Sequence, residues 1–440
     1  MSWLRERRRY LAGLTLFTLL AGDAWRYSLS WYGWGAIVAL LALAWLALAV
    51  RQRVDFRRVP VALGAVAGYL TLSIAWSAYP GASAIGVAVT LITGAIGIVL
   101  TQLLSLSEFV RALSVALRWI LGLSFLFELA VATLVRHPLL PFWTSYDEPY
   151  PAAFNWSRNL LFEGGRIQGI TGNANLLAFA ALLALIVLGI QWRVRVAEPG
   201  NEASLPRAVA ASWILLALGI LVLTRSSTVI VAGVGVALVL AVLLLARRFA
   251  GPARTALYCA ALATGATIVT LVVVFRDALL DLLGRSDDLT GRLDIWSAVI
   301  GLAQERPWFG WGWVSYWAPW VEPFDDLAVI NGVTYLQAHN AWLDVWLQLG
   351  VLGLLLVGVL ALTTVTRTLT WAVDAPRGAV VDPGPLRLAP VMILTMLLVH
   401  SLAESRLLLE AGLLLFVWIA VASRRHELHT LSAQRTGARR

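Results

Sequence analysis

The sequence has no lysine, a single cysteine and few charged residues of any kind. All 34 basic residues are arginine, and only 13% of the 440 residues are charged, whereas soluble domains average about 25%. Because Cys259 is alone, the chain can form neither a disulfide framework nor a cysteine-based metal site. With 60% hydrophobic residues, this composition excludes an ordinary soluble domain and indicates a polytopic membrane protein.

Several motifs of soluble enzymes are also missing. The sequence contains no GxxxxGK[ST] phosphate loop, no HExxH and no Asp-x-Asp. The acidic pairs Asp287–Asp288 and Asp325–Asp326 could hold a metal, but no histidine stands near them in the sequence. We therefore expect no metal site and no cofactor, and a metal-bound nucleotide-sugar donor is disfavoured.

Apolar runs predict an all-α fold with about twelve transmembrane helices. The predicted spans cover residues 10–25, 31–50, 61–79, 82–103, 113–135, 174–190, 208–224, 228–246, 255–275, 341–363, 388–403 and 407–423. The arginine-rich N-terminus followed by the first run resembles a signal peptide, but it lacks a convincing cleavage site and is interpreted as an uncleaved first helix.

The positions of the arginines predict which side of the membrane each end of these spans faces. Basic segments at 5–9, 51–58, 111, 193–207, 247–254, 367–387 and 424–440 all fall on one side when twelve spans are threaded. Positive charge between spans marks the cytoplasmic side, so both termini are predicted to be cytoplasmic. The net charge of +9 is thereby explained by topology, and no nucleic-acid partner is expected.

The predicted opposite face holds the two longest non-apolar stretches, 136–173 and 276–340. We expect a single membrane domain over 1–440, with 136–173 as a periplasmic loop and 276–340 as a large periplasmic region between spans 9 and 10. Within the latter, residues 292–304 are predicted to form a short helix lying on the membrane. The segment 424–440 is expected to be a disordered cytoplasmic tail.

His339 and Asn340 stand at the start of an apolar run that is long enough to cross a bilayer. A helix N-terminus disfavours positive charge, so it should keep the imidazole neutral and able to accept a proton. Gly350 and Gly353 leave one helix face without side chains, where a neighbouring helix could pack closely. A structural alternative is an interfacial histidine that only caps the helix.

Six arginines of the predicted periplasmic face lie where topology does not require them. Arg225 occupies a short turn in LTRSSTVIV, and Arg292 opens GRLDIW. Either guanidinium could donate two parallel hydrogen bonds to a phosphate. The structural alternative for Arg225 is a turn residue whose side chain snorkels to the membrane surface. The alternative for Arg292 is an ion pair with Asp288 or Asp294. Arg276, Arg285 and Arg306 are conspicuous for the same reason.

Arg166 begins RIQGITGNANLLAF, a glycine-rich stretch that leads into the span at 174–190. Asn173 is placed to cap that helix, with Asn175 next to it. Capping accounts for the asparagine but leaves Arg166, at the same membrane depth, unexplained.

Five tryptophans gather in one segment of the large region, PWFGWGWVSYWAPW. They suit an aromatic belt at the membrane interface, or a stacking surface for sugar rings. The cluster comprises Trp308, Trp311, Trp313, Trp317 and Trp320.

These groups are compatible with one chemistry. A periplasmic active face has neither ATP nor nucleotide sugars, so the donor must carry the energy, as a lipid-linked diphosphate sugar does. Its leaving group is a stable anion, and the enzyme then needs cations and one base.

The same residues resemble a known family. HNAWLDVWLQLGVLG matches H-[NSQ]-x9-G-x2-[GTY] at His339, Asn340, Gly350 and Gly353, a pattern typical of O-antigen ligases. The wider superfamily also includes O-antigen polymerases and bacterial protein O-oligosaccharyltransferases. Three earlier blocks resemble it as well, around Arg166–Asn175, Thr224–Ser226 and Gly291–Trp296, although the family's Asn-Pro-Asn is Asn173-Ala174-Asn175 here.

The resemblance implies an all-helical, C-type glycosyltransferase-like fold in the inner membrane. It implies metal-independent, inverting transfer of glycan from undecaprenyl diphosphate to a sugar hydroxyl of lipid A–core on the periplasmic face. His339 would be the base, Arg225 and Arg292 the diphosphate binders and Arg166 a supporting residue, as would be Asn173, Asn175 and Asn340. A polymerase or a protein O-oligosaccharyltransferase remains an alternative, and so does a lipid or solute transporter.

Overall fold

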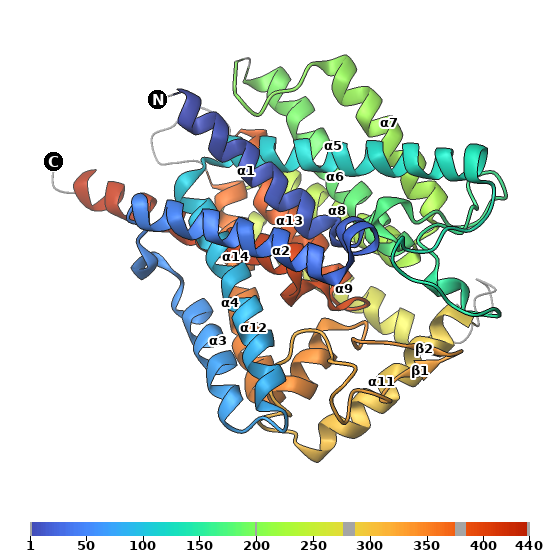
Figure 1. The fold of residues 1–440 in the computed structure, drawn as a ribbon. Coiled ribbons are helices and arrows are strands. Elements are labelled where there is room, and N and C mark those ends of the chain that lie inside the picture. The colour runs from blue at the N-terminus through green and yellow to red at the C-terminus, as the bar shows by residue number, and fades with distance from the viewer. Residues whose placement is uncertain (1, 199, 276–286, 375–383, 438–440) are drawn as a thin grey trace.

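The computed structural model describes residues 2–198, 200–275, 287–374 and 384–437, and these are almost entirely helical (Figure 1). The helices are α1 (Ser2–Leu20), α2 (Gly22–Arg51), α3 (Val61–Leu72), α4 (Pro80–Leu103), α5 (Leu106–Ala130), α6 (Ala174–Ala197), α7 (Arg207–Thr224), α8 (Ser227–Ala246), α9 (Gly251–Val274), α11 (Asp287–Glu305), α12 (Ala341–Val373), α13 (Leu388–His400) and α14 (Glu410–Gly437). A hairpin of β1 (Val329–Ile330) and β2 (Val333–Thr334) is antiparallel.

Short helical turns join these elements. They are η1 (Phe56–Arg58), η2 (Ser73–Ala75), η3 (Val131–Val135), η4 (Ala152–Phe154), η5 (Gly169–Thr171), η6 (Pro385–Arg387) and η7 (Ser405–Leu408). Of these, η5 leads into α6 and η7 joins α13 to α14, so both lie beside the site described below.

Seven helices in the described ranges are long and apolar enough to cross a membrane: α2, α4, α5 with its extension to Val135, α6, α7, α8 and α12. Two shorter apolar helices cover Val61–Ala75 and Pro385–His400. Helices satisfy every backbone polar group within one segment, which lipid requires. An all-α polytopic membrane protein is thus confirmed, while the number of spans and the C-type fold stay predictions.

Burial separates the central helices from the peripheral ones. In α6, 78% of the apolar window is buried, against 17% in α2. The exposed leucines of α2 then suit a surface in contact with lipid chains. In the centre, α5 and α14 meet through Phe109 and Trp418, whose rings stack with centroids 3.8 Å apart.

The region before α12 has a small apolar core of its own. Ile295 and Val299 of α11 pack with Trp317, Phe324 and Leu347. The tryptophan cluster is divided by this core, because Trp317 is 1% exposed whereas Trp320 is 76% exposed. It is therefore neither a uniform belt nor a single open surface. The predicted helix at 292–304 is confirmed as part of α11.

Gly350 interrupts α12 with φ 68° and ψ −171°. A Cβ atom there would lie 2.2 Å from the carbonyl oxygen of Trp308, so only glycine fits beside this backbone. The predicted close approach exists, but its partner is the loop after α11 and not a neighbouring helix. Gly353 faces Leu349 of its own helix instead.

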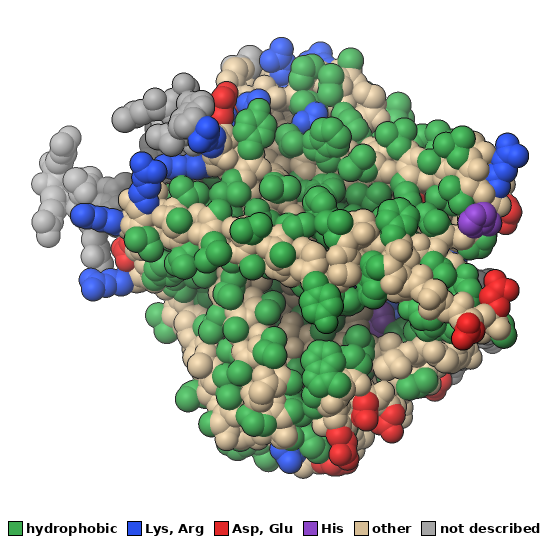
Figure 2. Space-filling view, in the orientation of Figure 1, with side chains coloured by type: hydrophobic (Ala, Val, Ile, Leu, Met, Phe, Trp, Pro, Cys, Tyr) green, Lys and Arg blue, Asp and Glu red, His purple; other side chains and the backbone are tan. Residues whose placement is uncertain are grey.

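Charged side chains are unevenly distributed along the molecule. In Figure 2, most basic side chains lie toward the end that carries both termini, and most acidic ones lie toward α11 and the hairpin. This separation is the one that the arginine pattern predicts for the two faces of a membrane protein. The expectation of a disordered tail after Arg424 is wrong for the described part, since α14 continues to Gly437.

Candidate functional site

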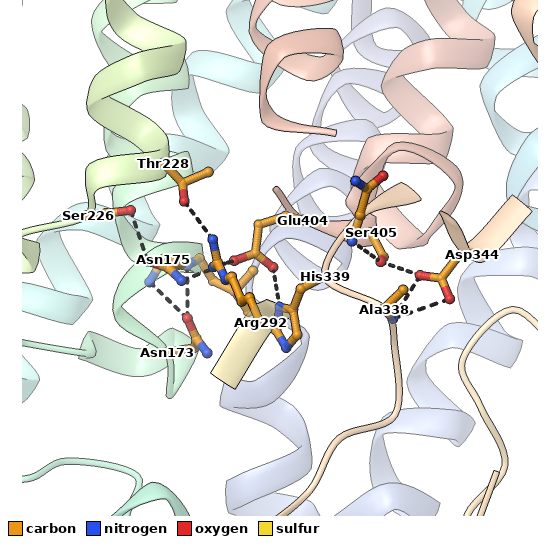
Figure 3. A network of polar contacts seen from close by, with 12 residues as sticks. Asn173, Asn175, Ser226, Thr228, Arg292, Ala338, His339, Asp344, Glu404 and Ser405 are labelled. Carbon is orange, nitrogen blue, oxygen red and sulfur yellow. Dashed lines mark hydrogen bonds and ion pairs between the residues drawn. The ribbon is translucent and has the colours of Figure 1, made fainter. Parts of the chain in front are cut away.

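Five segments that are distant in sequence meet around one carboxylate (Figure 3). They are the start of α6, the turn between α7 and α8, the helix α11, the residues before α12, and the loop after α13. They bring together Asn175, Thr228, Arg292, His339 and Glu404. Residues from the three earlier sequence blocks and from the His339 motif all lie in or beside this cluster.

Glu404 is the centre of the cluster, with a side chain that is 4% exposed. One of its oxygens accepts from Arg292 Nη2 at 2.7 Å and from Asn175 Nδ2 at 3.0 Å. The other lies 2.9 Å from His339 Nδ1. Both oxygens of this buried carboxylate therefore have at least one partner.

The partners of Glu404 keep it ionised. Burial opposes ionisation, but the neighbouring His339 and Arg292 outweigh it, so the pKa of the Glu404 carboxyl falls from 4.5 to about 2. An ionised carboxylate can only accept hydrogen bonds, so His339 Nδ1 must carry the proton that lies between them. In the neutral ring, Nε2 is then left with a free lone pair, as a general base requires.

The backbone before α12 is held in a defined conformation. His339 has φ 50°, an uncommon value for a residue with a side chain. Asn340 follows as the helix cap, and its side chain accepts from the backbone N–H of Trp342 at 3.0 Å. Its own backbone N–H donates to Ser405 Oγ at 3.1 Å. The histidine and Glu404 are thus held by adjacent residues of the same two segments.

Asp344 supports this arrangement from behind. Its carboxylate accepts from Trp317 Nε1 at 2.9 Å, from the backbone N–H of Ala338 at 3.1 Å, and from Ser405 Oγ. The ring of Tyr335 packs edge-on against that of His339, with centroids 5.5 Å apart. Packing and hydrogen bonds on both sides therefore fix the orientation of the imidazole.

Arg292 reaches the cluster from α11. Its Nη1 donates to Thr228 Oγ1 at 3.1 Å, while Nη2 binds Glu404. Its ion pair is thus with a distant segment and not with exposed Asp294, whereas the side chain of Asp288 lies outside the described residues. The side chain is 19% exposed, so this guanidinium still has access to a ligand.

Arg166 ties the start of α6 to the end of α7. Its Nε donates to the carbonyl of Thr224 at 3.0 Å, and its Nη2 donates to Asn175 Oδ1 at 2.7 Å. Ser226 Oγ donates to the same amide oxygen at 2.9 Å. The predicted cap of α6 is confirmed, because Asn173 accepts from two backbone N–H groups of its first turn.

Arg225 differs from the other two arginines because its side chain is exposed. It ends α7 in the left-handed conformation, with φ 49°, and directs its guanidinium toward the loop at Gly164. Within the described part of the chain, no hydrogen bond or ion pair holds this guanidinium. It is a cation available to a ligand.

Among the described residues, Arg166, Arg225 and Arg292 lie around a site whose carboxylates are Glu404 and Asp344, which leaves an excess of positive charge. Arg306 does not contribute, because its guanidinium lies over the ring of Trp311 at 4.1 Å. Arg276 and Arg285 lie outside the described residues. Among the residues that are described, no group of three or more His, Cys, Asp or Glu side chains could hold a metal ion.

Sequence reasoning missed Glu404, Ser405, Asp344 and Thr228. A signal for the first two was present in SLAESR, a short polar segment between two apolar runs. An acidic residue at such a position is a functional candidate by itself. Asp344 stands five residues after His339, inside the apolar run that was interpreted as a span.

A helical membrane protein with exposed cations beside an oriented histidine belongs to the class that can bind an anionic headgroup and move a proton next to it. Residues 210–358 match the family model described as O-Antigen ligase. This match supports the resemblance to the O-antigen ligase family that its motifs indicate. The match includes Arg225, Arg292 and His339 and excludes Arg166 and Glu404. No curated protein matches the chain.

Proposed function

We propose that this protein is an O-antigen ligase that uses a glycan linked to undecaprenyl diphosphate as donor and a sugar hydroxyl of lipid A–core as acceptor. The reaction occurs on the periplasmic face of the inner membrane. The observation that carries the proposal is Glu404, which holds a histidine and an arginine on its two oxygens. This contact joins a base and a cation through one carboxylate.

His339 is the general base of the proposed reaction. Glu404 accepts the Nδ1 proton, so Nε2 takes the proton of the acceptor hydroxyl as that oxygen attacks the anomeric carbon of the donor. The new bond is oxygen to anomeric carbon, and the bond that breaks joins that carbon to the diphosphate. Among the described residues of the site, the carboxylates of Glu404 and Asp344 are both engaged, the first by His339, Arg292 and Asn175 and the second by Trp317, Ala338 and Ser405, so neither is free to form a covalent intermediate. One displacement with inversion follows.

The arginines stabilise the departing diphosphate. Arg225 has no partner among the described residues and supplies a complete guanidinium fork, and Arg292 adds a second from the side of Glu404. Arg166 contributes charge but is engaged by Thr224 and Asn175, which makes it a positioning residue. The diphosphate departs as a stable anion and needs no general acid.

A deletion strain complemented with variants tests this function. Loss of the lipopolysaccharide ladder, with lipid-linked polymer accumulating, is the result expected of a ligase. A single repeat left on the core would instead identify a polymerase, and an intact ladder with unglycosylated proteins would identify a protein O-oligosaccharyltransferase. Transport of lipid that continues in His339→Ala would overturn the assignment as an enzyme.

A further inference from the structure

A groove lies between α3, α12 and α14, toward the end of α12 that is remote from His339. Its volume is about 420 Å³, within the range of about 300–1,000 Å³ that is typical of small-ligand sites. Apolar side chains line its length, among them Ala65 of α3 and Leu356 and Val359 of α12. Arg367 and Arg424 also line it, mainly through the apolar parts of their side chains, and their guanidinium groups lie at one end of the groove.

The four α12 residues of the lining follow one face of the helix toward its C-terminal end. Leu356, Val359, Thr363 and Arg367 are spaced by three or four residues, as neighbours on a helix surface are. The face is apolar over its first half and ends in a cation. The groove therefore has a hydrocarbon part and a charged end, with Thr363 between them.

The charged end has more donors than acceptors. Arg367 Nε lies 3.2 Å from Glu427 Oε2, and Arg424 Nη1 donates to the same oxygen at 2.5 Å. Arg367 Nη1 is buried and has no hydrogen-bond partner among the described residues. A buried donor without an acceptor is unfavourable, so this nitrogen indicates a missing anionic oxygen.

We propose that the groove binds one anionic phospholipid, with its phosphate on Arg367 and Arg424 and one acyl chain along α3 and α12. Arginine pairs with phosphate through two parallel hydrogen bonds, and basic pockets between transmembrane helices are typical sites for anionic lipid headgroups. A free phosphate would leave the apolar part empty. A zwitterionic lipid would bring its own cation to the two arginines.

This lipid site is separate from the site around Glu404. His339 precedes α12 and Arg367 lies in its last two turns, and the uninterrupted part of the helix between Gly350 and Arg367 spans roughly 25 Å at 1.5 Å per residue. This uninterrupted part alone covers most of the hydrocarbon core of a bilayer, which is about 30 Å thick. The bound phospholipid is thus held at the membrane face opposite the proposed active site, and it is not the donor.

Native mass spectrometry of the full-length protein in detergent, freed of lipid and titrated with phosphatidylglycerol or phosphatidylcholine, tests the proposal. The wild-type protein should retain one phosphatidylglycerol and bind it about tenfold more tightly than phosphatidylcholine. The affinity of Arg367→Gln for phosphatidylglycerol should fall by about the same factor. Ala65→Phe, which fills the groove and leaves both cations, should weaken binding as well. Arg195→Gln is the matched control, because Arg195 is an exposed arginine in the last turn of α6 and does not line the groove.

Three results would overturn the proposal. Equal retention of the two lipids would remove the role of charge, and equal losses in Arg195→Gln and Arg367→Gln would make the effect one of general surface charge. Inorganic phosphate that displaces the lipid from wild-type protein, and binds Ala65→Phe unchanged, would identify a free-anion site. Arg367→Lys, which keeps the charge, serves as the folded reference if the glutamine variant elutes as aggregate.

Discussion

Glu404 and Glu410 stand six residues apart, and each holds two positively charged or protonatable groups from different parts of the chain. Glu404 binds Arg292 and His339. Glu410 binds Arg406 at 2.7 Å and also pairs with Arg26 of α2. Both carboxylates are buried, with side chains 4% and 10% exposed. In local geometry the two clusters are alike.

They differ in charge balance and in access. Around Glu410, two arginines are matched by two carboxylates, because Asp23 also pairs with Arg26 at 2.7 Å. The guanidinium of Arg26 is covered by Trp34, whose ring centre is 4.1 Å away. A balanced and covered cluster has no remaining charge for a ligand, so it serves to join α2 to the start of α14.

The cluster around Glu404 has an excess of arginine and an opening. Arg225 is exposed and makes no hydrogen bond or ion pair within the described chain, and Arg292 and His339 keep 19% and 15% of their side chains exposed. Buried charge alone therefore does not mark a functional site in this molecule. The feature that distinguishes the candidate site from the cluster around Glu410 is unpaired positive charge close to an oriented base.

The largest expected effect is that of His339→Ala. Removal of a general base costs about 10²–10⁴-fold in rate, so transfer of glycan to lipid A–core should fall below detection. The amount of lipid-linked donor and the elution profile of the purified protein should not change. Transfer would be measured with isolated donor and acceptor; a rate within a few-fold of the wild type would exclude His339 as the base.

Glu404→Gln should have the second largest effect. The rate of glycan transfer should fall roughly 10²-fold, because the amide no longer fixes the Nδ1 proton of His339. The loss should appear mainly in kcat, and Glu404→Asp should recover part of it. A purely structural role would instead lower the yield of folded protein without changing kcat, which separates the two explanations.

The same variant tests the ionisation of Glu404. The folded-state pKa of about 2 lies below the ordinary 4.5, so this group adds stability above about pH 4.5 and loses it as the pH falls toward 2. The difference in melting temperature between wild type and Glu404→Gln, followed by tryptophan fluorescence, should be constant from pH 8 to about 5 and shrink below that. A difference that already vanishes near neutral pH would mean that the carboxyl is protonated there.

The ends of the helices were the parts of this structure that sequence predicted best. Asn173 caps α6 as expected, because a cap depends on residues a few positions away, whereas α12 is capped by Asn340 and not by the neighbouring His339 that sequence offered. The turn at Arg225 followed from two long apolar runs with almost nothing between them. Local and periodic signals sufficed for these features.

The contacts between segments were not predictable from the same signals. Arg292 was given Asp288 or Asp294 as possible partners, since sequence offers only near neighbours, whereas its partner is 112 residues away. Gly350 was predicted to admit a helix, and it admits the loop at Trp308. Both outcomes depend on how distant elements pack, which one sequence does not specify.

Arg225→Ala should have a smaller effect than the two changes above, of about tenfold. The loss of a charge-assisted hydrogen bond to the diphosphate at this exposed position corresponds to about 1.5 kcal/mol, the lower end of the usual range, and it should raise the KM for the donor. Arg292→Lys should recover little, because an ammonium group cannot bind Glu404 and phosphate as a fork. Donor titrations with purified enzyme measure both; full activity of Arg292→Lys would exclude the bidentate role.

Glu410→Gln should have the smallest effect on catalysis and a large one on stability. The change leaves Arg26, whose side chain is 5% exposed, without one of its two carboxylates, and breaking a buried pair costs about 3–5 kcal/mol. The melting temperature should fall, while kcat per folded molecule, corrected by active fraction after size exclusion, should match the wild type. If kcat fell as far as in Glu404→Gln, the balanced cluster would be part of the catalytic machinery, and charge balance would no longer separate the two carboxylates.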